Sequence, residues 1–88
     1  MSDSDTLFDF PCQFPSKAMG KARPDLDVIV LECILPHVES IREGAVKIRE
    51  SKGGKYFSVT VTIEATSRQQ LDAIYQSLTD CPEIVMVL

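Results

Sequence analysis

The feature that most constrains the fold is the strict alternation of apolar and polar side chains from Tyr56 to Ala65. The apolar members of this stretch are Phe57, Val59, Val61, Ile63 and Ala65. Because successive side chains of a strand point to opposite faces, the pattern predicts a strand with one buried and one solvated face. A shorter alternation over residues 45–50 precedes it, and Gly53-Gly54 between them permits the positive φ of a hairpin turn. The two segments are therefore expected to form an antiparallel hairpin in a sheet covered on one side.

One helix is expected before this hairpin in the sequence, and a second helix after it. The first is predicted to start near Pro24-Asp25 and to run to about Leu35, because Pro36 disfavours helical geometry in the residue before it. The second is predicted to begin at Thr66 or Ser67, since each satisfies a capping box with a glutamine three residues later. Its apolar stripe is Leu71, Ile74, Tyr75 and Leu78.

Two further strands complete the pattern. Proline cannot donate a ladder hydrogen bond, so Pro15 places the start of the first strand near Phe14, with its end at Gly20. Residues 83–88 are mostly apolar and include the β-branched Ile84, Val85 and Val87, which predicts the last strand. The order βαββαβ is that of an α+β, ferredoxin-like sandwich, a four-stranded antiparallel sheet of order 4-1-3-2 with two helices on one face. Residues 10–88 are expected to form this single domain, and residues 1–9, without periodicity, a flexible N-terminal segment.

Charge and hydropathy disfavour two classes of partner. The formal net charge of −4 should repel phosphate backbones unless Lys and Arg gather on one face, so nucleic acid is disfavoured. The longest apolar stretch, residues 27–38, is interrupted and too short to cross a bilayer, so no membrane association is expected. The first residues are acidic, unlike an export signal, which favours a cytoplasmic location.

The cysteines and the single histidine do not form a recognisable site. Cys12, Cys33 and Cys81 are odd in number and lack a C-x-x-C, so reduced thiols are expected, Cys33 in the core and the other two in loops. His37 would have to serve any Ser-His-Asp or Cys-His site, but a structural or solvated histidine is expected so near a helix end. We therefore expect no catalytic residues, no metal site and no cofactor, hence no enzyme.

Several short motifs carry a resemblance to a known family. They are Phe10-Pro11, Met19-Gly20, Tyr56 with Ser58-Val59, Ala65-Thr66, Gln70, Tyr75 and Met86-Val87-Leu88. With these residues the chain resembles, from about Phe8 to Leu88, the YbeD-like family of small uncharacterised bacterial proteins, also called DUF493 or UPF0250. The resemblance implies a cytosolic protein similar to ACT-type regulatory domains, which bind small molecules, and a link with lipoate synthesis. It implies no established catalytic residues.

The similarity to ACT-type domains directs attention to the turn after the first strand, where those domains bind ligands. Gly20 permits close approach, and Lys21 and Arg23 add positive charge beside a helix start, so these three residues are the candidate ligand site. Asp25 stands where a glycine would admit a ligand, and it would repel a carboxylate. A plain turn with solvated side chains is the alternative.

Apolar residues outside the predicted core are the candidate partner-binding residues. Val28, Leu31 and Leu35 widen the stripe of the first helix beyond what one sheet face can cover. The surplus is expected to be covered by the second helix, by the N-terminal segment or by another subunit in a homodimer. Val85 and Val87 lie on a predicted edge strand, which invites strand addition.

Together these features favour a non-enzymatic regulatory or adaptor module that binds a small-molecule metabolite or a protein partner. The family resemblance implies that this module is connected with lipoate metabolism. The alternatives are an accessory enzyme or acyl-transfer factor that uses a cysteine, and a single-stranded nucleic-acid-binding protein.

Overall fold

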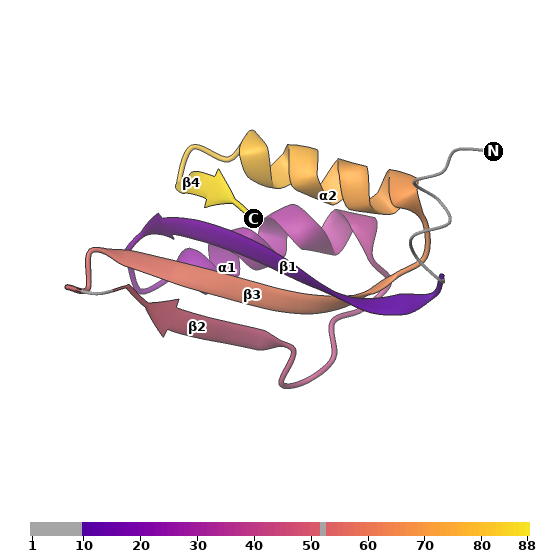
Figure 1. Ribbon diagram of the computed structural model, residues 1–88, viewed down its shortest axis with the longest axis horizontal. Helices are drawn as coiled ribbons and strands as arrows, with labels where there is room; N and C mark the ends of the chain where they lie inside the picture. The colour runs from indigo at the N-terminus through magenta and orange to yellow at the C-terminus, as the bar shows by residue number, and fades with distance from the viewer. Residues whose placement is uncertain (1–9, 52) are drawn as a thin grey trace.

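The computed structural model describes residues 10–51 and 53–88, and its elements follow the predicted βαββαβ order (Figure 1). Their bounds are β1 Cys12–Lys21, α1 Leu26–Ile34, the 3-10 turn η2 Leu35–His37, β2 Val46–Glu50, β3 Tyr56–Ala65, α2 Arg68–Thr79 and β4 Ile84–Val87. The strands pair antiparallel in the order β2-β3-β1-β4, which confirms the predicted 4-1-3-2 arrangement. The predicted flexible segment 1–9 lies outside the described residues.

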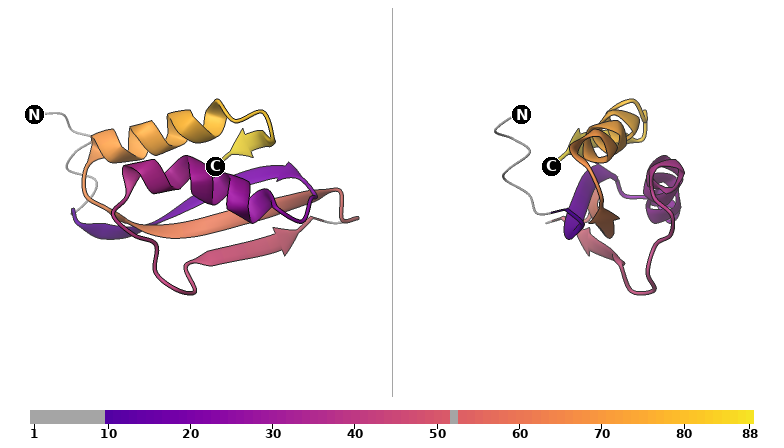
Figure 2. Two further views of the ribbon diagram at one scale, coloured as in Figure 1. Left: turned by 180° about the vertical axis from the view of Figure 1, so that it is seen from behind. Right: turned by 90° about the vertical axis from the view of Figure 1, so that its right-hand side faces the viewer.

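Both helices pack on one face of the sheet, as predicted, and the core lies between these two layers (Figure 2). The buried apolar residues are Ala18, Leu26, Val30, Ile34, Val59, Val61, Ile63, Ala65, Leu71, Ile74, Leu78 and Ile84. The alternation of β3 is largely realised, since Val59 and Val61 are inaccessible to solvent while Thr60 between them is half-buried, and the exception is Ser58, which is buried although it lies on the polar side. On the opposite face of the sheet, the part of the chain that the structure describes forms no helix.

β1 begins two residues before the predicted start at Phe14, and it includes Pro15. The Leu88 amide donates to the Lys17 carbonyl over 2.9 Å, so the backbone of Lys17 faces β4. The backbone groups of every second residue of a strand face the same side, so the Pro15 nitrogen also faces the side of β4. β4 pairs only with Ala18–Gly20 and does not reach Pro15. The proline therefore breaks no ladder bond, which is why the predicted start was wrong.

The helix starts match the sequence signals in α2 better than in α1. Ser67 is the N-cap of α2, and its hydroxyl accepts a hydrogen bond from the Gln70 amide over 3.0 Å, as predicted. In α1 the N-cap is Asp25, so Pro24 lies just outside the helix rather than in its first turn. The Asp25 carboxylate makes no cap bond and instead accepts from Arg23.

Gly20 lies where β1 approaches both α1 and the turn before β4. A Cβ atom at this position would lie 2.5 Å from the Glu83 carbonyl oxygen and 3.0 Å from a Leu26 methyl group. The ladder between β1 and β4 also shifts register between Met19 and Gly20. The space beside Gly20 is thus filled by the protein itself.

We expect Gly20→Ala to lower the free energy of unfolding by about 1–3 kcal/mol, because the added methyl group must displace a backbone carbonyl. Urea denaturation followed by circular dichroism measures the change. Lys21→Ala, at the exposed next residue, is the control and should stay within about 0.5 kcal/mol of the parent. Equal midpoints for both variants would show that the turn at Glu83 moves aside freely.

Candidate functional site

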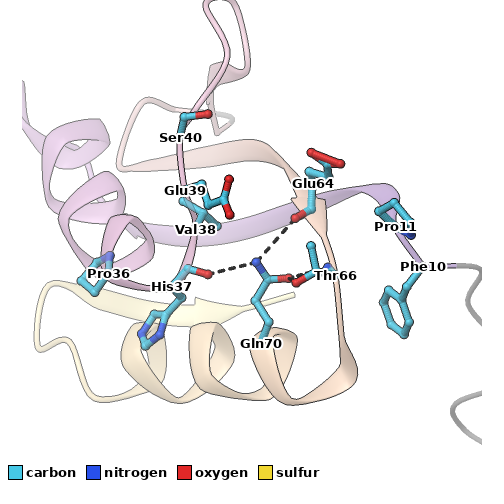
Figure 3. A pocket seen from close by; sticks show the side chains of 10 residues that line it. All are labelled: Phe10, Pro11, Pro36, His37, Val38, Glu39, Ser40, Glu64, Thr66 and Gln70. Atoms are coloured by element: carbon cyan, nitrogen blue, oxygen red, sulfur yellow. Dashed lines mark hydrogen bonds between the residues drawn. The ribbon is translucent and has the colours of Figure 1, made fainter.

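A polar pocket of about 620 Å³ opens between the start of β1, the segment after α1, the end of β3 and the start of α2 (Figure 3). Its lining consists of Phe10, Pro11, Pro36, His37, Val38, Glu39, Ser40, Glu64, Thr66 and Gln70. The lining holds the carboxylates of Glu39 and Glu64 and no lysine or arginine. The pocket therefore favours a cationic occupant over an anionic one.

Gln70 holds the walls of this pocket together. Its Nε2 donates to the His37 carbonyl over 2.9 Å and to the Glu64 carbonyl over 3.5 Å. Its Oε1 accepts from the Thr66 amide over 2.7 Å and from the Thr66 hydroxyl over 3.3 Å (Figure 3). Both ends of the side chain are thus used by the protein, so Gln70 shapes the pocket rather than offering itself to a ligand.

His37 has a structural partner, as predicted. Its Nε2 lies 2.8 Å from the Ser77 hydroxyl of α2. Serine and histidine are the residue types of a nucleophile and its base, but a triad also needs a group that orients the imidazole through its other nitrogen. The described part of the chain shows no hydrogen bond to that nitrogen.

The three thiols are all half-buried, and Cys12 is the first residue of β1, so its predicted loop position was wrong. The pKa of Cys33 is raised to about 11, mainly by burial and to a smaller extent by a hydrogen bond with the Cys81 thiol. Cys81 Sγ in turn donates to a Glu83 carboxylate oxygen over 3.6 Å. At neutral pH Cys33 is therefore protonated, which is the unreactive form of a cysteine. Within residues 10–51 and 53–88, no group of His, Cys, Asp or Glu side chains is arranged to hold a metal ion.

An apolar groove of about 370 Å³ runs between α2 and the sheet, beside the end of β4. Its lining consists of Phe14, Ser16, Lys17, Arg68, Leu71, Asp72, Ile74, Tyr75, Leu78, Val87 and Leu88. Tyr75 and Leu88 are 55% and 62% exposed, which is high for large apolar side chains. From here on we call this feature the groove.

The groove runs along an uncovered edge of β1. The backbone groups of Gln13 and Pro15 face the same side as those of Lys17, and within the described residues no strand pairs with β1 there. The sequence analysis missed this edge, because the length of β1 does not reveal how far β4 extends along it. The one sequence signal was the shortness of the apolar run after Pro82.

The candidate ligand residues Gly20, Lys21 and Arg23 lie together at the end of β1 but line neither the polar pocket nor the groove. Gly20 is buried, whereas Lys21 and Arg23 are exposed. Arg23 Nε donates to the Asp25 carboxylate over 2.6 Å, and this hydrogen bond lowers the pKa of Asp25. Ligand binding at this turn stays a prediction.

The candidate partner-binding residues divide between two places. On α1, Val28 and Leu35 are about half exposed, at 50% and 47%, while Leu31 packs partly against the core. On β4, Val85 is exposed, whereas Val87 is half-buried and lines the groove. Neither α2 nor any other described element thus covers the whole apolar surface of α1, and its predicted role in a homodimer stays a prediction.

Comparison with known proteins settles the family. Residues 5–88 match the model of a family described as a protein of unknown function, DUF493. The chain belongs to the DUF493 family. It is 47% identical to a UPF0250 protein of Chromobacterium violaceum, with all of both chains covered. It is 39% identical to the UPF0250 protein NE1487 of Nitrosomonas europaea, with 96% of this chain and 97% of the relative covered. The resemblance found in the sequence is confirmed.

A solved structure supports the same fold. The solution structure of protein HP0495 from H. pylori matches with a TM-score of 0.74 and 16% sequence identity, covering 92% of this chain and 85% of that one. At this identity the likeness speaks for the DUF493 fold and not for activity. Among the described residues, no helix has the length and apolar character needed to cross a membrane.

We expect Gln70→Ala to lower the free energy of unfolding by about 1–3 kcal/mol, because the Thr66 amide and the His37 carbonyl lose their partner. Thermal denaturation measures the change. Gln69→Ala is the matched control, since Gln69 is the exposed neighbour on the same helix. Equal losses in the two variants would mean that the bonds of Gln70 contribute nothing beyond helix propensity.

We expect iodoacetamide at pH 8 to modify Cys33 far more slowly than free cysteine, because the thiolate that reacts is scarce below a pKa of about 11. The rate should rise steeply between pH 9 and 11, and peptide mass spectrometry resolves it for each thiol. Rapid labelling of Cys33 at pH 7 would contradict the assigned burial.

Proposed function

We propose that the protein is a non-catalytic adaptor that binds an extended segment of a partner protein in the groove. The observation that carries this proposal is that an edge of β1, with which no strand of the described residues pairs, coincides with an apolar groove beside it. An extended segment that adds to a sheet edge gains main-chain hydrogen bonds, while pockets for alternate side chains supply specificity.

The geometry of the edge defines what the segment would contact. β1 has ten residues and β4 only four, so among residues 10–51 and 53–88 no strand pairs with the backbone groups of Gln13 and Pro15 on this side. The Gln13 amide and the carbonyls of Gln13 and Pro15 supply its hydrogen bonds, since they face that side. Every second side chain of the guest would then enter the groove against Leu71 and Tyr75.

The proposal has three further parts, which concern the location, the role and the pathway of the protein. A cytoplasmic location, a regulatory role and the link with lipoate synthesis are proposed along with the adaptor function, on the strength of the family resemblance. The alternative of an acyl-transfer factor needs a reactive thiol, and burial of Cys33 with its pKa of about 11 weighs against that residue. A small cationic metabolite in the polar pocket is the alternative ligand, because the pocket has ligand-like size and two carboxylates.

We expect peptides selected from a random display library to bind along β1 and to shift the backbone NMR signals of Gln13, Phe14 and Ser16. The Gln13 amide should become protected from hydrogen exchange when the guest strand pairs with it. Tyr75→Ser should weaken binding by at least about tenfold, because exposed tyrosines at the centre of an interface contribute strongly.

Gln76→Ser is the matched control, since Gln76 is the exposed neighbour on α2 and lies outside the groove. It should bind the selected peptides as tightly as the parent. Signals that shift around Gln70 and Thr66 instead would place the ligand in the polar pocket and overturn the proposal. A selection that returns no binder would also count against it.

A further inference from the structure

The sheet face opposite the helices carries a concentration of positive charge that is unexpected in an acidic chain. The core-facing residues of β1 and β2 include Ala18, Val46 and Ile48, which pair with Val59 or Val61 of β3. By alternation the other face presents four cations, which are Lys17, Lys21, Lys47 and Arg49. We call this set, with the β3 residues between them, the basic face.

The strand register places these cations close together. Lys17 and Lys47 both pair with Thr60 of β3, so they flank it in one row that crosses three strands. In the next row Arg49 and Met19 flank Ser58. Two strand spacings separate the outer members of each row, which amounts to about 10 Å. The four cations therefore surround a strip of β3 hydroxyl groups.

These charges are not neutralised within the described part of the chain. The ion pairs found there join Arg23 to Asp25 and Arg68 to Asp72, and none involves the four cations of the basic face. The carboxylate on the same face, Glu64, pairs with Gln13 at the far end of β3. On the opposite side of the molecule, α1 carries Asp27 and Glu32 but no lysine or arginine. The chain thus has a basic face and an acidic helical side.

Ser58 adds an independent observation. Its side chain lies within the basic face, between Arg49 and Met19, and the residue is only 8% exposed. Its hydroxyl is buried, and no protein atom in the described residues is its hydrogen-bond partner. Buried hydroxyls are normally bonded, so the partner of this one has to be a water molecule or a bound group that reaches it once the covering side chains move aside. A carboxylate, which only accepts hydrogen bonds, fits a hydroxyl ringed by cations.

We propose that the basic face binds an acidic segment of a partner protein, on a surface that shares only Lys17 with the groove. Charge complementarity supports this occupant, because four of the nine lysines and arginines lie on this one face of a chain whose formal net charge is −4. Nucleic acid fits less well, since bases need aromatic platforms and Tyr56, at the rim, is the aromatic residue that β3 offers on this face.

The test uses the full chain and a capped, fluorescent peptide of alternating aspartate and glutamate, about twelve residues long so that it spans the face in extended form. Fluorescence anisotropy should show binding at about 0.01 M ionic strength that is lost near 1 M. A peptide of alternating asparagine and glutamine should not bind. Lys47→Glu with Arg49→Glu should weaken binding by at least about tenfold, because repulsion replaces attraction at two sites.

Two controls separate local from general effects. Arg42→Glu with Lys55→Glu changes the net charge equally, outside the strand positions that form the basic face, and should alter the affinity by less than about threefold. Ser58→Ala should leave the circular dichroism spectrum unchanged yet weaken binding by about twofold to fivefold. Tyr75→Ser should have no effect here, so failure of the groove and failure of the basic face can be told apart.

Three outcomes would overturn the proposal. Equal losses in both charge-reversed doubles would mean that only net charge matters. Tighter binding of a single-stranded oligonucleotide than of the acidic peptide would assign the face to nucleic acid. An increase in mass of the free protein at low salt, measured by light scattering and abolished by Lys47→Glu with Arg49→Glu, would assign it to a second copy of the chain.

Discussion

The pairing of β1 with β3 is the constraint on which the rest of the structure depends. It runs without interruption from Cys12 opposite Ala65 to Lys21 opposite Tyr56. Because side chains alternate along both strands, this one register assigns every residue of the sheet centre either to the core or to the open face. A slip of one residue would either send Val59 and Val61 of β3 into solvent or bring Lys17 of β1 under the helices. The core and the basic face are therefore two consequences of the same pairing.

The unequal lengths of β1 and β4 account for the second candidate surface, the groove. β4 reaches only as far as Lys17 of β1, through the hydrogen bond from the Leu88 amide. Beyond that point no strand of the described residues pairs with this side of β1, and residues of α2 and β1 line the groove there. Edge strands present unpaired backbone groups that other chains can use. The proposed adaptor function follows from this geometry and needs no catalytic group.

The sequence predictions were accurate for features that depend on residues close together in the chain, and less accurate for features that depend on residues far apart in it. The hairpin, the bounds of β3 and the Ser67 cap rest on residues near one another in the chain, and the structure confirms all three. The start of β1 was predicted wrongly, because the cost of Pro15 in a strand depends on whether another strand lies beside it. The tertiary role of Gln70 also escaped prediction, since its bond to the His37 carbonyl joins residues 33 positions apart.

The sequence by itself determined the family, the order of the elements and the side of β3 that is buried. The family followed from the resemblance carried by short motifs, and the other two depend on periodicity, turn residues and local caps, which act over a few residues. Only the tertiary structure decided where the two candidate surfaces lie. The cations of the basic face come from β1 and β2, which are far apart in the sequence and become neighbours through β3. The groove exists because α2 and β1 meet where β4 ends, and pairing between distant strands sets that meeting point.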